Sequence, residues 1–340
     1  MKSRWFLVVF LVLGLALITA SAKATVNMVT EQLGNGAICY FEASESVSTV
    51  ISIFNTDDDD RWVHVMVWNH KSQHLKDHPW KLSEKGTLVL LAYYDSTSEK
   101  VIIKPIGGDA VDESKTDYYD VTQLTLVPGT DADNIQEIST GVYGGYIQLV
   151  VVQDNTHVAT LATPGENILY VTTALISEPN WWVGLPTYML QMTNSTNDLY
   201  QSGSGYIAKG AVQRIDTVNG NPATDPAILY GRWYASDTVK GTVVLVTPAK
   251  YTKPGDPTKP WSAKITDVTV CDESQNCTSY PAIEIYEVTR NTDLLETAGD
   301  DFSDQAGWVE LDNATMNTVG FILEEEAGKC DMLPMAKKEK

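Results

Sequence analysis

The sequence predicts an all-β protein made of one or two antiparallel, Ig-like β-sandwich domains that follow an N-terminal signal peptide. Short runs rich in Thr, Val, Ile and Tyr recur along the chain, and clusters of Gly, Pro, Asn and Asp separate them. Only Asn291–Thr297 and the final tail favour a short helix. With 43% hydrophobic residues, the 340-residue chain can bury a large core.

The predicted strands begin with Thr49–Asn55 and Trp62–Asn69, which the acidic turn Thr56–Arg61 joins. Strand Trp62–Asn69 is largely apolar on both faces, so we expect it in the centre of the core, and Gly145–Gln153 follows the same pattern. The other predicted strands are Thr87–Tyr94, Val121–Val127, Ile168–Ala174, Gly205–Arg214, Ile228–Tyr234, Thr242–Thr247, Ile265–Val270, Ala282–Val288 and Thr318–Leu323.

Turn-forming residues around positions 155–165 interrupt the strands and suggest a domain boundary. We therefore expect a β-sandwich domain over residues 25–160. Residues 161–340 form either a second β-rich domain or a continuation of the first.

The first 24 residues follow the plan of a secretory signal peptide. Lys2 and Arg4 precede the apolar run Trp5–Ile18, and small residues with A-x-A cleavage patterns follow it. We expect cleavage before Lys23 or Thr25 and a secreted, periplasmic or extracellular protein. A retained membrane anchor is the alternative, although the apolar run is short for a membrane span.

The formal charge of −20, from 24 Lys and Arg against 44 Asp and Glu, limits the partners of this protein. Nucleic acids and anionic membrane surfaces are bound by basic patches, so an acidic chain argues against both. Extracellular proteins, polysaccharides, cations or further copies of the chain are the expected partners.

Four cysteines in an exported chain favour disulfides. Cys271 and Cys277 lie between two predicted strands, where a hairpin would bring them opposite each other. That pairing leaves Cys39 with Cys330, although three pairings are possible for four cysteines. A metal site with four thiolates is the rival interpretation, but the C-x₂-C spacing is absent.

His70, His74 and His78 are spaced so that a helix would align them as ligands for Zn²⁺ or Cu²⁺. Turn-like residues and Pro79 argue against a helix there. In an extended chain they would share a face at roughly 13 Å per step, too far apart for one ion. We therefore expect histidines in a solvated loop and no tight metal site.

Two acidic clusters offer the hard oxygen ligands that Ca²⁺ prefers: the run Asp57, Asp58, Asp59 and Asp60, and the group Asp131, Asp133 and Asn134. Neither matches the EF-hand pattern. For Asp57–Asp60 we favour a solvated turn that prevents edge aggregation, with calcium binding as the alternative. No other cofactor is expected.

Trp181 and Trp182 lie in a loop-like stretch and form a candidate ligand site. Exposed indoles stack on the apolar faces of sugar rings, but a buried plug is the interpretation that we favour for this pair.

Signatures of common enzymes are absent from the sequence, including G-x-S-x-G, H-E-x-x-H, the Walker A loop and the dinucleotide fingerprint. A pair of hydrolytic carboxylates among 44 acidic residues depends on tertiary structure. We expect a protein without catalytic residues.

Strand pair Thr49–Asn55 and Val63–Asn69, strand Gly144–Val152 and segment Leu199–Tyr234 resemble a group of exported β-rich bacterial proteins of unassigned function. Gln148 stands where that group usually carries an acidic residue. The resemblance covers about half of the chain. It implies an exported β-sandwich and transfers no catalytic residue.

The expected function is therefore a non-catalytic structural or interaction role at the cell surface or in the extracellular matrix. A carbohydrate- or calcium-binding β-sandwich module is the alternative, and a secreted hydrolase is the third possibility.

Overall fold

The computed structural model describes residues 33–339 except for 72, 132, 157–161, 163–165, 178–180, 191–225, 237–238, 247–262, 286–287, 303–305, 316–317 and 327–328. The predicted signal peptide and the predicted strand Gly205–Arg214 lie outside the described residues, and so do the side chains of Trp181 and Cys330. Among the described residues, no helix has the length and apolar character needed to cross a membrane.

Residues up to Leu190 form two antiparallel sheets. Sheet 1 has the order β11 (Trp181–Leu185), β10 (Leu169–Ser177), β2 (Val47–Asn55), β5 (Thr87–Asp95), β6 (Lys100–Gly108) and β7 (Leu124–Leu126). Sheet 2 has the order β12 (Thr187–Leu190), β1 (Gly36–Ala43), β9 (Val142–Val152), β3 (Arg61–Asn69) and β4 (His74–Leu82), with β8 (Glu137–Ser139) also paired to β9. A 3-10 turn, η2, spans Asp109–Val111.

Residues after Pro226 form two more antiparallel sheets. Sheet 3 has the order β19 (Val288–Asn291), β14 (Val239–Val246), β21 (Val319–Glu326) and β22 (Lys329–Pro334). Sheet 4 has the order β17 (Cys277–Tyr280), β16 (Asp267–Asp272), β20 (Ala306–Thr315), β13 (Pro226–Tyr234) and β23 (Ala336–Glu339). β15 (Ala263–Ile265) pairs with β18 (Ile283–Ile285), and helix α3 spans Asp293–Asp301. The predicted all-β class is confirmed.

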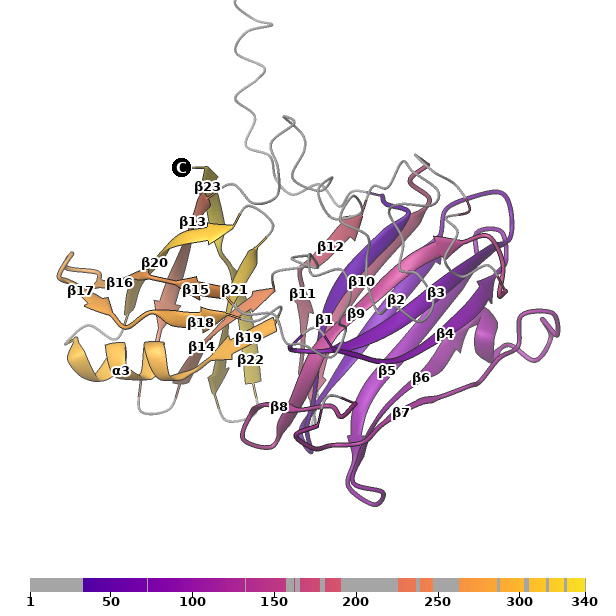
Figure 1. The fold of residues 1–340 in the computed structure, drawn as a ribbon, viewed down its shortest axis with the longest axis horizontal. Coiled ribbons are helices and arrows are strands. Elements are labelled where there is room, and N and C mark those ends of the chain that lie inside the picture. Colours follow the sequence, from indigo (N-terminus) through magenta and orange to yellow (C-terminus); the bar gives the residue numbers. More distant parts are fainter. Residues whose placement is uncertain are drawn as a thin grey trace, which may run out of the picture. The chain divides into compact units, whose positions relative to one another are not determined.

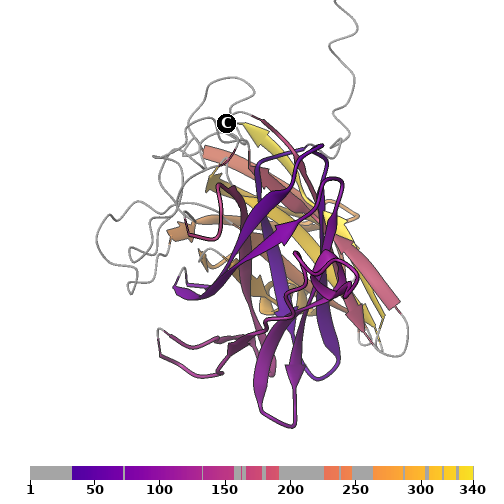
Figure 2. The same ribbon diagram turned by 90° about the vertical axis from the view of Figure 1, so that its right-hand side faces the viewer.

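Three hydrophobic clusters lie between the sheets, whose strands can be followed in Figures 1 and 2. In the first, Ile51 and Ile53 of sheet 1 pack with Val65 of sheet 2. The second joins the opposite face of sheet 2 to sheet 3 and includes Tyr40, Trp68, Tyr146, Val244 and Phe321. The third joins sheet 3 to sheet 4 and α3, and includes Leu245, Ile322, Val270, Val309 and Leu295.

Sheet 2 is therefore covered on both faces. This confirms the prediction that Trp62–Asn69 and Gly145–Gln153 belong to central strands, since the side chains of β3 from Val63 onward are all buried. The apolar character of both faces of these strands follows from having a core on each side.

Several local expectations differ from the structure. The stretch from His74, expected as a loop, is strand β4, and Pro79 is tolerated because β4 is an edge strand of sheet 2. The final tail contains β23, while the expected helix near Asn291–Thr297 is present as α3. Because β10, β11 and β12 pair within sheets 1 and 2, those sheets continue past the expected boundary near residue 160.

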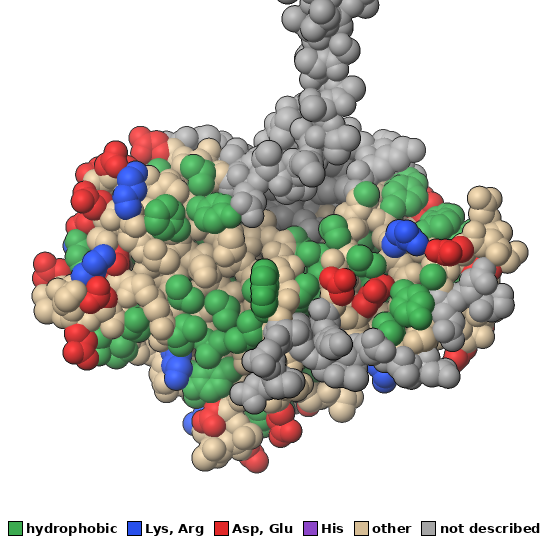
Figure 3. Space-filling model, turned by 180° about the vertical axis from the view of Figure 1, so that it is seen from behind, with side chains coloured by type: hydrophobic (Ala, Val, Ile, Leu, Met, Phe, Trp, Pro, Cys, Tyr) green, Lys and Arg blue, Asp and Glu red, His purple; other side chains and the backbone are tan. Residues whose placement is uncertain are grey.

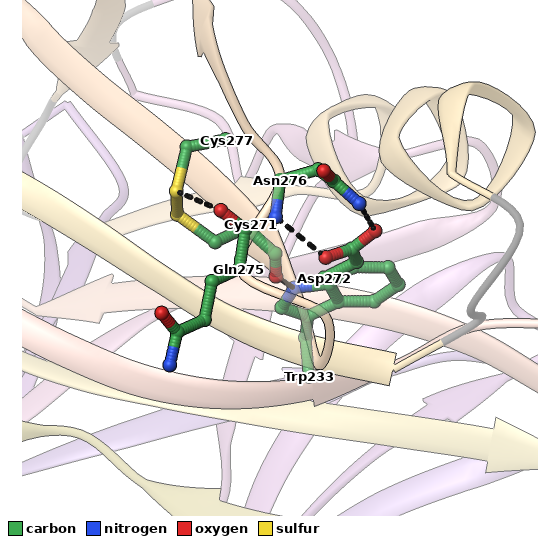
Figure 4. Close-up of a disulfide and its surroundings, with 6 residues drawn as sticks. All are labelled: Trp233, Cys271, Asp272, Gln275, Asn276 and Cys277. Atoms are coloured by element: carbon green, nitrogen blue, oxygen red, sulfur yellow. Dashed lines mark hydrogen bonds between the residues drawn. A yellow bond between two sulfur atoms is a disulfide. The ribbon is translucent and has the colours of Figure 1, made fainter.

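The predicted disulfide Cys271–Cys277 is confirmed. The two cysteines lie opposite each other in the β16–β17 hairpin (Figure 4). Asp272 orders the turn by accepting hydrogen bonds from the backbone and side-chain amides of Asn276, at 2.8 and 2.7 Å. The indole of Trp233 donates to the carbonyl of Cys271 at 3.2 Å, which ties the hairpin to β13.

The predicted Cys39–Cys330 disulfide is wrong, because Cys39 is a free, buried thiol. Its side chain points from β1 into the cluster between sheets 1 and 2. Burial raises the pKa of the thiol to about 12, against a smaller lowering by its hydrogen bond with Thr173. The pairing failed as a prediction because it came from elimination among four cysteines, while the alternation of β1 turns Cys39 into this core.

Cys39 should resist iodoacetamide at pH 8 in the native protein and react after unfolding without reductant, because a buried thiol with a raised pKa holds little thiolate. Mass spectrometry of Cys39-containing peptides measures both reactions. Protection that persists in denaturant and disappears only with reductant would mean that Cys39 is disulfide-bonded.

Candidate functional site

The carboxylates of Asp57–Asp60 lie in the turn between β2 and β3 and are paired with separate partners. Asp57 accepts hydrogen bonds from the guanidinium of Arg61, including one from Nε at 2.8 Å. Asp58 pairs with Lys85 at 2.8 Å, and Asp60 accepts from the hydroxyl of Tyr118 at 2.7 Å. The turn is thus neutralised largely by side chains of the chain itself.

The second acidic cluster forms a turn in which the amide of Asn134 donates to the carbonyl of Asp131 at 3.1 Å. Among the described residues, no group of three or more His, Cys, Asp or Glu side chains is placed to hold a metal ion. The structure therefore does not bring the predicted calcium ligands together.

The three histidines of the predicted solvated stretch have different surroundings. His70 follows β3 in a tight turn and is buried, with a pKa lowered to about 4, first by burial and then by the charge of Lys71. His78 lies 2.7 Å from Asp120, and the indole of neighbouring Trp80 donates to the Asp120 carbonyl at 3.0 Å. These partners fix His78 beside the first core.

His74 lies on the opposite face of β4 from His78. A register irregularity between β3 and β4, where Val67 pairs with Lys76 but Trp68 pairs with His74, adds a residue to β4. An added residue reverses the alternation of side chains, so the expectation that all three histidines share a face was wrong. His74 instead stacks edge-on against Trp68, with ring centroids 5.2 Å apart.

The same irregularity gives Asp77 two histidine neighbours. His74 Nε2 lies 3.1 Å and His64 Nε2 lies 3.6 Å from the carboxylate of Asp77. The pKa of Asp77 is well below its usual range, chiefly because of its interactions with His64 and then His74. The lowered pKa keeps Asp77 ionised beside these two imidazoles.

A polar cavity of about 490 Å³ lies beside the β3–β4 turn and is lined by His70, Lys71, Pro128, Gly129, Thr130, Gln136, Glu137 and Tyr143. The side-chain amide of the buried Gln136 donates to the carbonyl of Thr130 at 3.1 Å, and this hydrogen bond holds one wall of the cavity in place. Burial, followed by the charge of Glu137, raises the pKa of Tyr143.

A buried ionic group joins sheet 2 to sheet 3. Arg290 of β19 lies 3.6 Å from Glu42 of β1 and 2.9 Å from Glu325 of β21. Tyr40 donates a short hydrogen bond to Glu42. The pKa of Glu42 is raised by burial, which outweighs the lowering by Arg290 and by Tyr40. The side chains of Glu42 and Arg290 are 1% and 4% exposed, so this ionic group is closed to solvent and links the two sheets.

Trp182 is strongly exposed, at 73% of its surface, and lies in edge strand β11 rather than in the expected loop. Its side chain belongs to the outer face of sheet 1, which we define as the side chains of β2, β5, β6, β7, β10 and β11 that point away from sheet 2. On β2 these are Ser48, Val50, Ser52 and Phe54, which alternate with the buried positions.

The strand register places the side chains of the outer face in rows across sheet 1. One row begins with Trp182, Ile176 and Ser48 and continues through Tyr93, Ile102 and Thr125, of which Ile102 is buried. The next contains Gly184, Ala174, Val50, Leu91 and Lys104. Exposed faces of antiparallel sheets are normally polar, so a largely apolar outer face marks an interaction surface.

Acidic side chains are nearly absent from this face. Among the described outward positions of sheet 1, only Asp95 is acidic, and it accepts hydrogen bonds from Ser98 and Thr97 in the β5–β6 turn. Lys100 and Lys104 lie on the same face. Figure 3 shows hydrophobic side chains in the middle of its left half and acidic ones along the outer edge. This contrasts with the charge of −20 on the whole chain.

No protein-family model matches the chain, and no curated protein or solved structure matches it either. The resemblance to exported β-rich proteins therefore stays an expectation about fold and location. The outer face of sheet 1 is the candidate functional site that the described residues support best.

Proposed function

We propose that the protein is an exported, non-catalytic interaction protein of the cell surface or extracellular matrix. In this proposal its Ig-like sandwiches follow a cleaved signal peptide, and the outer face of sheet 1 is the binding surface. The observation that carries the proposal is an apolar, nearly carboxylate-free sheet face on a strongly acidic chain. The disulfide-bonded hairpin and the absence of a membrane-spanning helix among the described residues are compatible with export.

Binding should depend on the centre of the outer face. The double variant Val50→Lys/Leu91→Lys places two charges in one row of that face and should reduce binding at least tenfold. Purified mature chain is added to the insoluble surface material of the cells that export it, and the bound fraction is measured against concentration.

The matched control, Ser279→Lys/Thr297→Lys, makes the same charge change at exposed positions of β17 and α3 and should bind like the unmodified chain. Circular dichroism verifies that both variants are folded. Equal binding by the two double variants would contradict the outer face as the binding surface.

A carbohydrate-binding role is a second candidate, favoured by the exposure of Trp182. A sugar ring stacked on this indole would be lost in Trp182→Ala, whereas an apolar protein contact spread over several rows would only weaken. Pelleting with cellulose and with chitin separates the two, since only the carbohydrate role predicts retention that Trp182→Ala abolishes.

A further inference from the structure

The outer face of sheet 1 also indicates which partner covers it. We infer that two copies of this chain dimerise by packing their outer faces together, sheet against sheet. This inference rests on the proposed function, because it names the partner of the same surface.

The outer face is large enough for a contact between two sheets. β2, β5, β6 and β10 each contain nine residues, and the sheet has six strands. With five residues in β11 and three in β7, spacings of about 3.3 Å per residue and about 4.8 Å between strands give a face of roughly 700 Å². That area approaches the ~800 Å² that each partner of a stable complex buries. A single strand or a loop would cover only part of it.

The outer face also has the shape and chemistry of a sheet that stacks on another sheet. Val50 and Leu91 occupy neighbouring positions in one row, and Ile176 and Tyr93 lie in the next row. When two sheets stack about 10 Å apart, medium and large apolar side chains that alternate on their pleated surfaces interdigitate. The outer face of a second copy is a pleated apolar surface of the same size and therefore complements it.

The distribution of charge favours the outer face as the contact between two copies. Two copies with a formal charge of −20 each repel one another, so a contact is least unfavourable where carboxylates are absent. The outer face meets that condition, because its one acidic side chain among the described residues, Asp95, is the last residue of β5 and lies at the margin of the face. Lys100 and Lys104 further reduce the negative potential at the contact.

The negative charge of the two copies gives their dimerisation a distinctive dependence on salt. Screening weakens the repulsion between two acidic copies while leaving apolar contacts in place, so dimerisation should become tighter as salt increases. An acidic polymer held by Lys100 and Lys104 would show the opposite dependence and bind more weakly in salt.

Sedimentation velocity of the mature chain from 1 to 100 µM, in 50 and 500 mM NaCl, tests the inference. We expect a monomer–dimer equilibrium whose Kd falls at least threefold at 500 mM. Val50→Lys/Leu91→Lys should raise the Kd at least 100-fold even though it lowers the net negative charge. The Ser279→Lys/Thr297→Lys control has the same charge and should dimerise like the unmodified chain.

A milder variant keeps the test independent of folding defects. Trp182→Ala removes a side chain with few native contacts, so the fold should persist while the Kd rises about five- to tenfold. An unmodified chain that stays monomeric at 100 µM in both salts would overturn the second copy as partner. A dimer that is unaffected by all outer-face variants would also overturn it.

These outcomes are distinguishable from failure of the proposed function. A monomer that still binds cell-surface material through Val50 and Leu91 would retain the interaction role with a different partner. If binding to cell-surface material did not depend on Val50 and Leu91, the interaction role itself would be contradicted, whatever the oligomeric state.

Discussion

Replacing Arg290 with methionine should lower the free energy of unfolding by about 3–5 kcal/mol at pH 7, because it leaves a buried carboxylate without its cation. Glu42 is 1% exposed, and Arg290 is the cation that pairs with it between sheets 2 and 3. Methionine retains much of the volume of the aliphatic part of arginine, so the predicted loss comes mainly from charge. Urea unfolding followed by circular dichroism measures it.

The loss should shrink as the pH falls towards 4.5. The folded-state pKa of Glu42 is already above its ordinary value, and removing Arg290 removes an effect that lowers it. A raised carboxyl pKa contributes stability below the unfolded-state pKa, and that contribution disappears as pH rises through the folded-state pKa. The variant should therefore recover stability in acid.

Glu42→Gln/Arg290→Met provides the matched control, because it removes the buried charge together with its partner. The double variant should be more stable at pH 7 than Arg290→Met alone. An equal loss for Arg290→Met at pH 7 and pH 4.5, with no recovery in the double variant, would contradict this role of Glu42.

Substituting alanine for Gly145 should destabilise the protein by about 3 kcal/mol or prevent folding. Gly145 lies in β9 between Phe41 of β1 and Asn69 of β3, and a Cβ there would overlap the carbonyl oxygen of Trp68. Because the obstacle is backbone, the sheet ladder must shift to accept the methyl group. Thermal unfolding and the yield of folded protein measure the effect.

Gly184→Ala is the control for Gly145→Ala. Gly184 is also a strand glycine, but it lies in edge strand β11, and a Cβ there would meet nothing within 4 Å. Its unfolding free energy should change by less than about 0.5 kcal/mol. Similar losses for both variants would mean that the close approach of β3 and β9 is not the cause.

The alternation of apolar residues predicted the class of the fold and several strands, but it could not assign every face. Thr87–Tyr94 is apolar at both alternate sets of positions, with Leu88 and Leu90 in the core and Val89 and Leu91 on the outer face. Such a pattern predicts a strand covered on both sides, as β3 is. The structure instead leaves the second set outward, and this difference reveals the candidate surface.

The sequence placed an aromatic ligand site at Trp181 and Trp182 because adjacent indoles stand out locally. The exposure of Trp182 contradicts a buried plug for this residue, and the other members of its row come from strands far away in the sequence. The Arg290–Glu42 pair was missed for the same reason, since each charge is isolated in its own strand. Residue spacing carries no information about pairs that only tertiary packing creates.

The pairing of β1 has a consequence for the order in which the chain folds. Gly36 lies opposite Val150 of β9 on one side and Leu190 of β12 on the other, so β1 emerges early but finds both partners late. Pairings between such distant segments carry a large loop-closure cost and fold on millisecond to second timescales. Sheet 2 cannot be completed until residue 190 has been made, and until then its apolar strands depend on remaining extended or on being shielded by a chaperone. Connectivity alone therefore delays the completion of sheet 2 until β9 and β12 have been made.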